Sequence, residues 1–127
     1  MIPVACALIE DELGRLLIAK RPEGKCLGGL WEFPGGKLEN GESPEMALRR
    51  ELREELRIET EILEVLEPVE HHYDKFSIYL IPCRTKILAG IPDPTEHSEI
   101  AWLHLDQIDV NTLAPADIPI LAKISSS

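Results

Sequence analysis

Three glutamates near the middle of the chain have a spacing that could bind a metal ion. Glu51, Glu54 and Glu55 stand at positions i, i+3 and i+4, so on a helix their side chains project from one face, with Cβ atoms about 5 to 6 Å apart. Like charges at that distance repel one another. A hard divalent cation such as Mg²⁺ binds oxygen ligands and would offset this repulsion. The competing interpretation is a solvated acidic face that the neighbouring arginines balance.

A glycine pair precedes this cluster. In the stretch GGLWEFPGGKLENGE, Gly35 and Gly36 follow a short apolar run and lie upstream of the three glutamates. Glycine has no side chain and permits positive φ, so backbone carbonyls and amides there can come close to an ion or to phosphate oxygens. Glycines and carboxylates together favour a metal and phosphate site over a solvated face.

Apolar runs and turn residues predict the elements that must position these groups. Ser43 and Pro44 are typical of a helix start, and the helix should run to about Arg57. A short helix that Pro119 can start should end the chain. The predicted strands are residues 2–10, 14–21, 30–33, 58–73, 76–88 and 100–105. The first two of these strands should form a pair. This order predicts a mixed α/β sandwich.

Composition limits the possible partners. The 127 residues, 44% hydrophobic and 28% charged, predict a single globular domain over residues 1–127. A net charge of -10 would repel a nucleic acid polymer or an anionic membrane surface, so a phosphate ligand would need a cation beside it. The N-terminal apolar run lacks basic residues and is soon followed by acidic ones, which predicts a cytoplasmic protein. Three widely spaced cysteines predict reduced thiols.

The residues from Gly36 to Ile58 match a known signature. Gly36 is followed after five residues by Glu42, and after seven more by Arg-Glu-Leu-Arg-Glu-Glu. This pattern resembles the Nudix box, which marks hydrolases of a nucleoside diphosphate linked to another group. One position departs from it, because Arg57 stands where the box usually has glycine at the helix end. If Arg57 keeps a left-handed conformation, the cost is ~1 kcal/mol, and no metal ligand is lost.

Two further stretches, GGLWEFPGGK and LAPADIPIL, are similar to the MutT branch of this superfamily and to its relative, the bacterial CTP pyrophosphohydrolase. The resemblance implies the Nudix fold, an α/β/α sandwich with a mixed β-sheet. It also implies dependence on Mg²⁺, with Mn²⁺ as a substitute, and hydrolysis of a nucleoside triphosphate to the monophosphate and pyrophosphate. The first hypothesis is a MutT-like enzyme acting on 8-oxo-dGTP. The second is an enzyme acting on CTP or a modified cytosine nucleotide.

A third hypothesis is a non-catalytic module that only senses a nucleotide. The complete set of box residues favours an enzyme, because a binding module has no need of every part of a hydrolytic metal site. A monomer and a homodimer are both compatible with the sequence.

The resemblance implies roles for individual residues. Glu51 and Glu54 would act in catalysis, with Arg50 pairing with a box glutamate and Glu42 anchoring the preceding loop. Glu96 precedes Trp102 by six residues, like a MutT loop glutamate that reaches the metal; Glu99 is its rival. The residues implied to hold the metal are Gly35, Glu51, Glu54, Glu55 and Glu96.

The same resemblance implies four substrate contacts. Arg21 and Lys37 flank the WEFPGG segment and would contact phosphates. Phe33 and Asp117 would contact the base. Phe33 could equally belong to the core, and Asp117 could instead cap the short helix that follows it.

Overall fold

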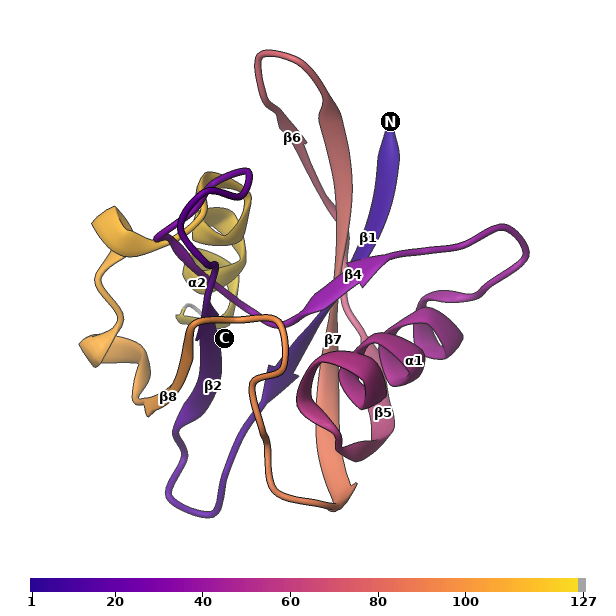
Figure 1. Cartoon of the computed structure of the whole chain (residues 1–127), viewed down its shortest axis with the longest axis vertical. Coiled ribbons are helices and arrows are strands. Elements are labelled where there is room, and N and C mark those ends of the chain that lie inside the picture. Colours follow the sequence, from indigo (N-terminus) through magenta and orange to yellow (C-terminus); the bar gives the residue numbers. More distant parts are fainter. Residues whose placement is uncertain (126–127) are drawn as a thin grey trace.

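Two β-sheets and two α-helices make up the structure, a computed structural model that describes residues 1–125 (Figure 1). The helices are α1 (Pro44–Leu56) and α2 (Ile118–Ser125). Short 3-10 turns cover Leu105–Gln107, Val110–Thr112 and Pro115–Asp117. The strands are β1 (Ile2–Ile9), β2 (Leu16–Lys20), β3 (Trp31–Glu32), β4 (Gly35–Lys37), β5 (Glu59–Val65), β6 (Val69–His72), β7 (Ser77–Ala89) and β8 (Glu99–Leu103).

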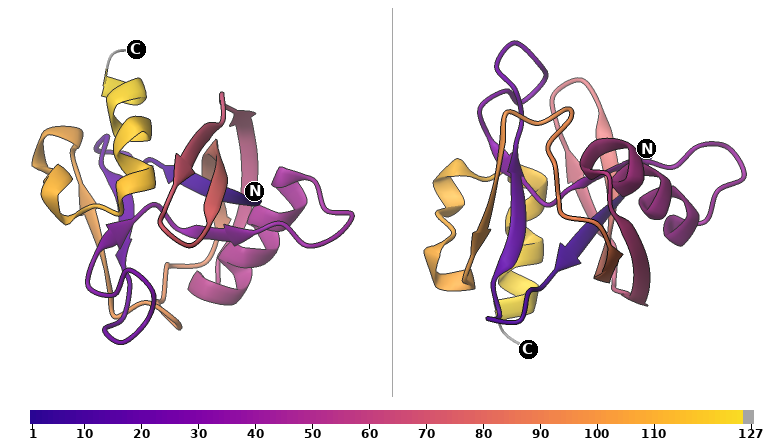
Figure 2. Two further views of the ribbon diagram at one scale, coloured as in Figure 1. Left: turned by 90° about the horizontal axis from the view of Figure 1, so that it is seen from above. Right: turned by 60° about the horizontal axis from the view of Figure 1, so that its bottom comes forward.

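The larger sheet is mixed and has the order β4-β1-β7-β5. β1 runs parallel to β7, with Ile2 opposite Ile78 and Ile9 opposite Thr85. β4, β5 and β6 pair antiparallel, β4 with β1 and the other two with β7. A second, antiparallel sheet has the order β3-β2-β8. The two helices lie on opposite sides of β1 (Figure 2). The predicted mixed α/β sandwich is confirmed.

Two details of the strand prediction are wrong. β1 and β2 do not form a paired hairpin but lie in different sheets, joined at one bridge between Glu10 and Leu16. Both edges of β1 are occupied by β4 and β7, so β2 has no edge to join. The predicted strand 58–73 is divided into β5 and β6 around Pro68, and proline cannot donate to a strand ladder.

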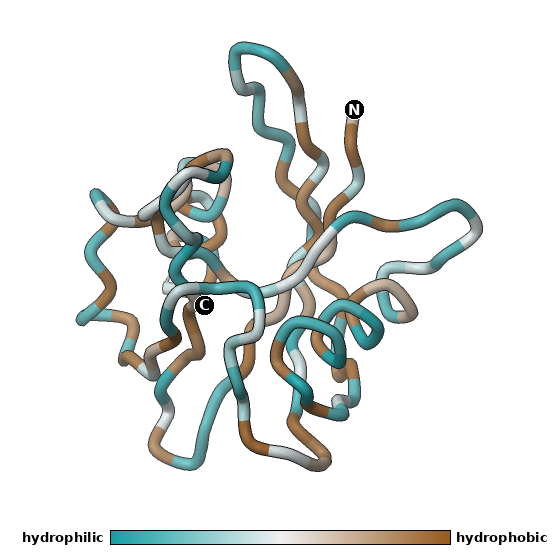
Figure 3. Tube along the Cα trace, in the orientation of Figure 1, coloured by the Kyte–Doolittle hydropathy of each residue, from teal (hydrophilic) through white to brown (hydrophobic). Residues whose placement is uncertain are grey.

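The core has two parts, one on each side of β1. Ala5, Ala7 and Ile9 pack with the apolar stripe of α1, while Cys6 and Leu8 pack with residues of α2 and the smaller sheet. This alternation follows from the two-residue period of a strand. The predicted stripe of α1 is fully buried and consists of Ala47, Leu48, Leu52 and Leu56. Figure 3 shows hydrophilic residues concentrated on the exposed side of α1 and at the β6–β7 turn.

α1 begins in the predicted form, and it ends with a left-handed residue. The Ser43 hydroxyl accepts a hydrogen bond from the Met46 amide at 3.1 Å, and Pro44 occupies the first helical position. Arg57 adopts the left-handed conformation, with φ 57° and ψ 38°, and its amide donates to the Arg53 carbonyl oxygen at 3.1 Å. The helix therefore ends as a glycine would end it, with an arginine bearing the strain. No helix within residues 1–125 is both long and apolar enough to span a membrane.

Candidate active site

A cavity of about 1010 Å³ lies where β1, β3, β4 and α1 meet the loop 90–98 and the segment 113–117. Its wall includes most of the predicted site residues: Arg21, Phe33, Gly35, Lys37, Glu51, Glu55, Glu96 and Asp117. Arg50 and Glu54 are not part of the lining, and the Glu54 side chain is 56% exposed. Glu99, the first residue of β8, also lies outside it and is 3.7 Å from Lys20, so of the two rival glutamates only Glu96 reaches the cavity.

The glycine pair allows two close approaches. A Cβ atom on Gly35 would clash with the Ala5 carbonyl oxygen and with Cys6 Cα, so only glycine lets β4 lie this close to β1. A Cβ atom on Gly36 would occupy the space of the Glu51 carboxylate. The pair therefore brings the backbone of β4 against the carboxylate end of α1.

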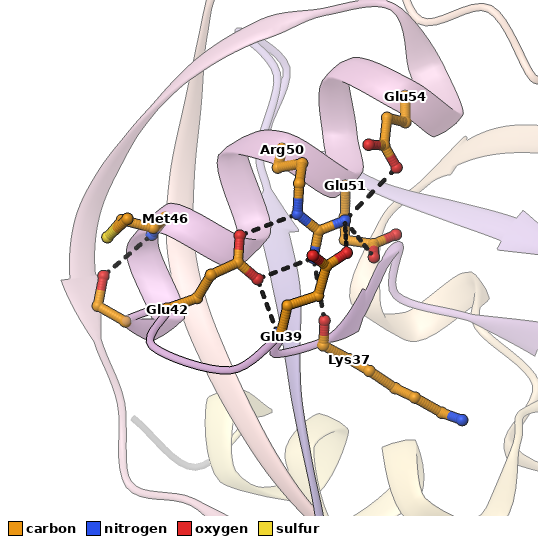
Figure 4. Close-up of polar contacts among 8 residues, drawn as sticks. Lys37, Glu39, Glu42, Met46, Arg50, Glu51 and Glu54 are labelled. Atoms are coloured by element: carbon orange, nitrogen blue, oxygen red, sulfur yellow. Dashed lines mark hydrogen bonds and ion pairs between the residues drawn. The ribbon is translucent and has the colours of Figure 1, made fainter.

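Arg50 joins α1 to the segment before it (Figure 4). Its Nε and Nη2 each donate to a different Glu42 carboxylate oxygen at 2.9 Å. Its Nη1 lies 3.0 Å from Glu51 Oε1 and 3.5 Å from Glu54 Oε2, and Nη2 donates to the Lys37 carbonyl oxygen at 3.2 Å. The Arg50 hydrogen bonds lower the pKa of Glu42 to about 2. Glu42 also accepts from a backbone amide of its own loop at 2.8 Å, so it anchors that loop.

Glu55 has an environment that suits a cation. Its side chain is 7% exposed, and burial, followed by the negative charge of Glu51, raises its pKa. Glu55 Oε1 is buried and has no hydrogen-bond partner within residues 1–125. Leaving such an oxygen unpaired costs free energy. A divalent cation bound here would satisfy it, so the residues fit a metal of this class.

The side chains predicted to bind a metal do not already surround a common point in the described part of the chain. Within the described part of the chain, no three acidic, histidine or cysteine side chains form a cluster ready to hold an ion. Arg50 attracts the Glu51 and Glu54 carboxylates to its own guanidinium. Closing a metal shell would therefore require these carboxylates to turn from Arg50 toward the ion.

The cavity wall also carries a buried carboxyl group. Asp117 is 6% exposed, and its Oδ2 accepts a hydrogen bond from the Phe33 amide at 2.8 Å rather than from an amide of α2. Burial raises the pKa of Asp117 to about 8, although the Phe33 hydrogen bond acts in the opposite direction. Near neutral pH the group is mostly protonated, so it can donate as well as accept. Phe33 itself is 3% exposed and belongs to both the core and the cavity wall.

Glu32 and His97 also line the cavity wall and contact each other, and sequence reasoning did not find either residue. Arg21 Nη1 donates to Glu32 at 3.2 Å, and His97 Nε2 lies 2.9 Å from Glu32 Oε2. Arg21 Nε also donates to a loop carbonyl, so Arg21 is held at the wall. A charged residue in the middle of the apolar run LWEFP was a signal for Glu32. His97 had no comparable signal in its loop.

The chain resembles known proteins over nearly its full length. The NUDIX domain family matches residues 2–124. The chain is 40% identical over 121 residues to the CTP pyrophosphohydrolase of Escherichia coli, an alignment that covers 95% of this chain and 89% of that protein. It is 32% identical over 128 residues to the 8-oxo-dGTP diphosphatase of Haemophilus influenzae, covering 98% of this chain and 91% of that one.

Two solved structures have the same fold. The solution structure of the E. coli ORF135 protein has a TM-score of 0.85 and 38% identity, with 99% of this chain and 89% of that chain covered. The crystal structure of a MutT NUDIX hydrolase from Burkholderia pseudomallei has a TM-score of 0.80 and 29% identity, with 97% of each chain covered.

Proposed function

The chain belongs to the Nudix family and is a pyrophosphohydrolase of the MutT-like type, and we propose that it hydrolyses a nucleoside triphosphate to the monophosphate and pyrophosphate. The reaction would use Mg²⁺, or Mn²⁺ in its place. The observation that carries the proposal is one cavity whose wall combines two groups of residues. Glu51, Glu55 and Glu96 form a group of carboxylates, the carboxylate end, while Phe33 and Asp117 form a second, buried group joined by a hydrogen bond. A nucleotide needs both, a cation for its phosphates and a binding surface for its base.

The residues of the carboxylate end have separate tasks. When bound, the cation lowers the pKa of water and neutralises charge on phosphoryl oxygens. Glu51, Glu54, Glu55 and Glu96, with the Gly35 carbonyl, would hold it. Arg50 holds Glu51 through their 3.0 Å contact before the ion binds, and Glu51, once turned toward the ion, would orient the attacking water. Lys37 and Arg21 contact phosphate oxygens, which keeps positive charge local in an acidic protein.

Asp117 limits which bases can bind. A protonated carboxyl presents one donor beside one acceptor. Cytosine, with its N4 amine beside N3, and 8-oxoguanine, with N7–H beside O6, each offer the complementary pair. Unoxidised guanine offers two acceptors, N7 and O6, on its Hoogsteen edge, although its Watson–Crick edge presents N1–H beside O6. Asp117 therefore favours cytosine and 8-oxoguanine nucleotides over dGTP only where the purine presents its Hoogsteen edge.

Similarity over nearly the full chain supports an order for these two candidates. The relative named CTP pyrophosphohydrolase is 40% identical to this chain, against 32% for the H. influenzae relative named 8-oxo-dGTP diphosphatase. We therefore place a cytosine nucleotide first and 8-oxo-dGTP second. We also propose that residues 1–127 form one Nudix domain and that the enzyme works in the cytoplasm as a monomer or homodimer.

A substrate panel tests the proposal. Pyrophosphate release would be measured with Mg²⁺ for CTP, dCTP, 5-methyl-dCTP, 8-oxo-dGTP and dGTP at matched concentrations. We expect the cytosine nucleotides to have the highest kcat/KM and dGTP the lowest. Highest activity on dGTP would refute the role of Asp117, and no hydrolysis of any nucleotide would support the non-catalytic sensing module.

A further inference from the structure

The loop 90–98, between β7 and β8, brings two side chains to the carboxylate end of the cavity. Glu96 and His97 both line the cavity, and the His97 side chain is only 4% exposed. In Figure 1 the loop runs beside α1. Neither residue lies on a helix or a strand. Contacts other than a regular hydrogen-bond ladder must therefore fix their positions.

Thr95 attaches this loop to the end of α1. Its amide donates to the Glu55 carbonyl oxygen at 3.0 Å, and its hydroxyl lies 2.9 Å from the carbonyl oxygens of both Glu54 and Glu55. The Asp93 amide donates to the Leu56 carbonyl oxygen at 3.0 Å. The last carbonyls of a helix have no partner within the helix. The loop supplies these partners, so its position depends directly on the helix turn that carries the glutamates.

A second attachment lies on the other side of the two residues. The Ser98 amide donates to the Lys20 carbonyl oxygen of β2 at 3.0 Å. Glu96 and His97 are thus held between the end of α1 and the smaller sheet. Between these attachments, His97 Nε2 lies 2.9 Å from Glu32 Oε2 and Nδ1 lies 3.7 Å from Glu55 Oε2. A shift of about 1 Å in the loop would break the shorter contact.

We propose that Thr95 is a positioning residue for the carboxylate end of the cavity. Its hydroxyl fixes the loop against α1 and thereby places Glu96 and His97 beside Glu55. Thr95 itself touches neither metal nor substrate. The inference rests on the proposed function, because it takes Glu96 as an oxygen donor to the cation. Removing a group that orients metal-binding side chains typically weakens metal binding by about 10- to 100-fold.

Thr95→Val and Thr95→Ser form a matched pair. Valine keeps the shape and removes the hydroxyl, whereas serine keeps the hydroxyl and removes a methyl group. Mn²⁺ binding would be titrated without nucleotide by electron paramagnetic resonance, with Glu54→Gln as the control for the metal site. We expect Thr95→Val to raise the Kd for Mn²⁺ about tenfold and Thr95→Ser to change it by less than about twofold. Thr95→Ala lacks the hydroxyl as well and should match valine.

Hydrogen exchange of the metal-free protein gives a second readout. The Thr95 amide should exchange faster in the valine variant than in the serine variant, because the loop opens more often. If valine and alanine bind Mn²⁺ like the wild type while Glu54→Gln binds it weakly, the Thr95 inference is wrong and the metal site stands. If Glu54→Gln also binds Mn²⁺ like the wild type, the proposed metal site is wrong too. Equal losses in the valine and serine variants would show that the hydroxyl is not the cause.

Discussion

Replacing Asp117 with asparagine should change how stability depends on pH. The carboxyl is 6% exposed and has a pKa of about 8 in the folded protein, against about 3.9 for an aspartate in an unfolded chain. Asparagine has nearly the same shape, and its carbonyl oxygen can still accept from the Phe33 amide. The substitution therefore removes the titration while keeping the hydrogen bond.

The sign and size of the effect follow from proton linkage. Between the two pKa values the folded state holds a proton that the unfolded state has lost, so the free energy of unfolding falls as pH rises. The contribution of Asp117 is fully present below about pH 4 and is lost as pH rises through about 8. One proton corresponds to about 1.4 kcal/mol per pH unit. Between about pH 5 and about pH 7, the titration of Asp117 should therefore lower the free energy of unfolding of the wild type by about 3 kcal/mol. Asp117→Asn should not show this decrease.

Urea denaturation of both proteins at about pH 5, 6 and 7 measures this difference. Other buried carboxyls titrate in both proteins, so the wild-type-minus-variant difference isolates Asp117. Asp106→Asn, at an exposed position, controls for the loss of one carboxylate. Parallel pH profiles for wild type and Asp117→Asn would show that the carboxyl is ionised in the fold, and the donor-acceptor argument for base choice would lose its basis.

Three further predictions concern the base, the helix end and the pH optimum. Asp117→Asn should change the ratios of kcat/KM between nucleotides by amounts equivalent to about 1 to 3 kcal/mol, the scale of one buried hydrogen-bond mismatch. Unchanged ratios in the substrate panel would show that Asp117 has only a structural role. Arg57→Gly should raise the free energy of unfolding by at most about 1 kcal/mol. Glycine relieves the left-handed strain, but it also gives the unfolded chain more conformational entropy, which offsets part of the gain. Turnover should stay the same. Activity should increase above neutral pH because the attacking water must lose a proton, so a rate maximum near about pH 5 would contradict this mechanism.

Local patterns predicted the parts of the site that lie on one element. The start of α1 at Pro44 and its buried stripe follow from capping rules and a 3.6-residue period, whereas the sequence left the conformation of Arg57 open. β4 was not predicted, because two glycines and a lysine carry no strand signal; β4 is a strand because β1 offers it an edge.

The contacts between distant segments could not be predicted from local patterns. Glu32 and His97 are 65 positions apart and meet because the loop is attached to both α1 and β2. The hydrogen bond from Phe33 to Asp117 spans 84 positions. Whether Asp117 capped a helix or faced the cavity depended on this tertiary contact, since its local sequence allows both.

The products that wild type and Glu54→Gln form from CTP show whether the protein is a metal-dependent pyrophosphohydrolase. Phosphorus-31 NMR of CTP incubated with each protein and Mg²⁺ distinguishes pyrophosphate and monophosphate from inorganic phosphate and diphosphate. We predict that the wild type produces only pyrophosphate and CMP and stops when EDTA is added. Glu54→Gln, with an unchanged melting temperature, should be at least about a hundredfold slower, because it lacks one ligand charge. Inorganic phosphate as the product, full activity in EDTA, or an unimpaired Glu54→Gln would contradict the proposed function.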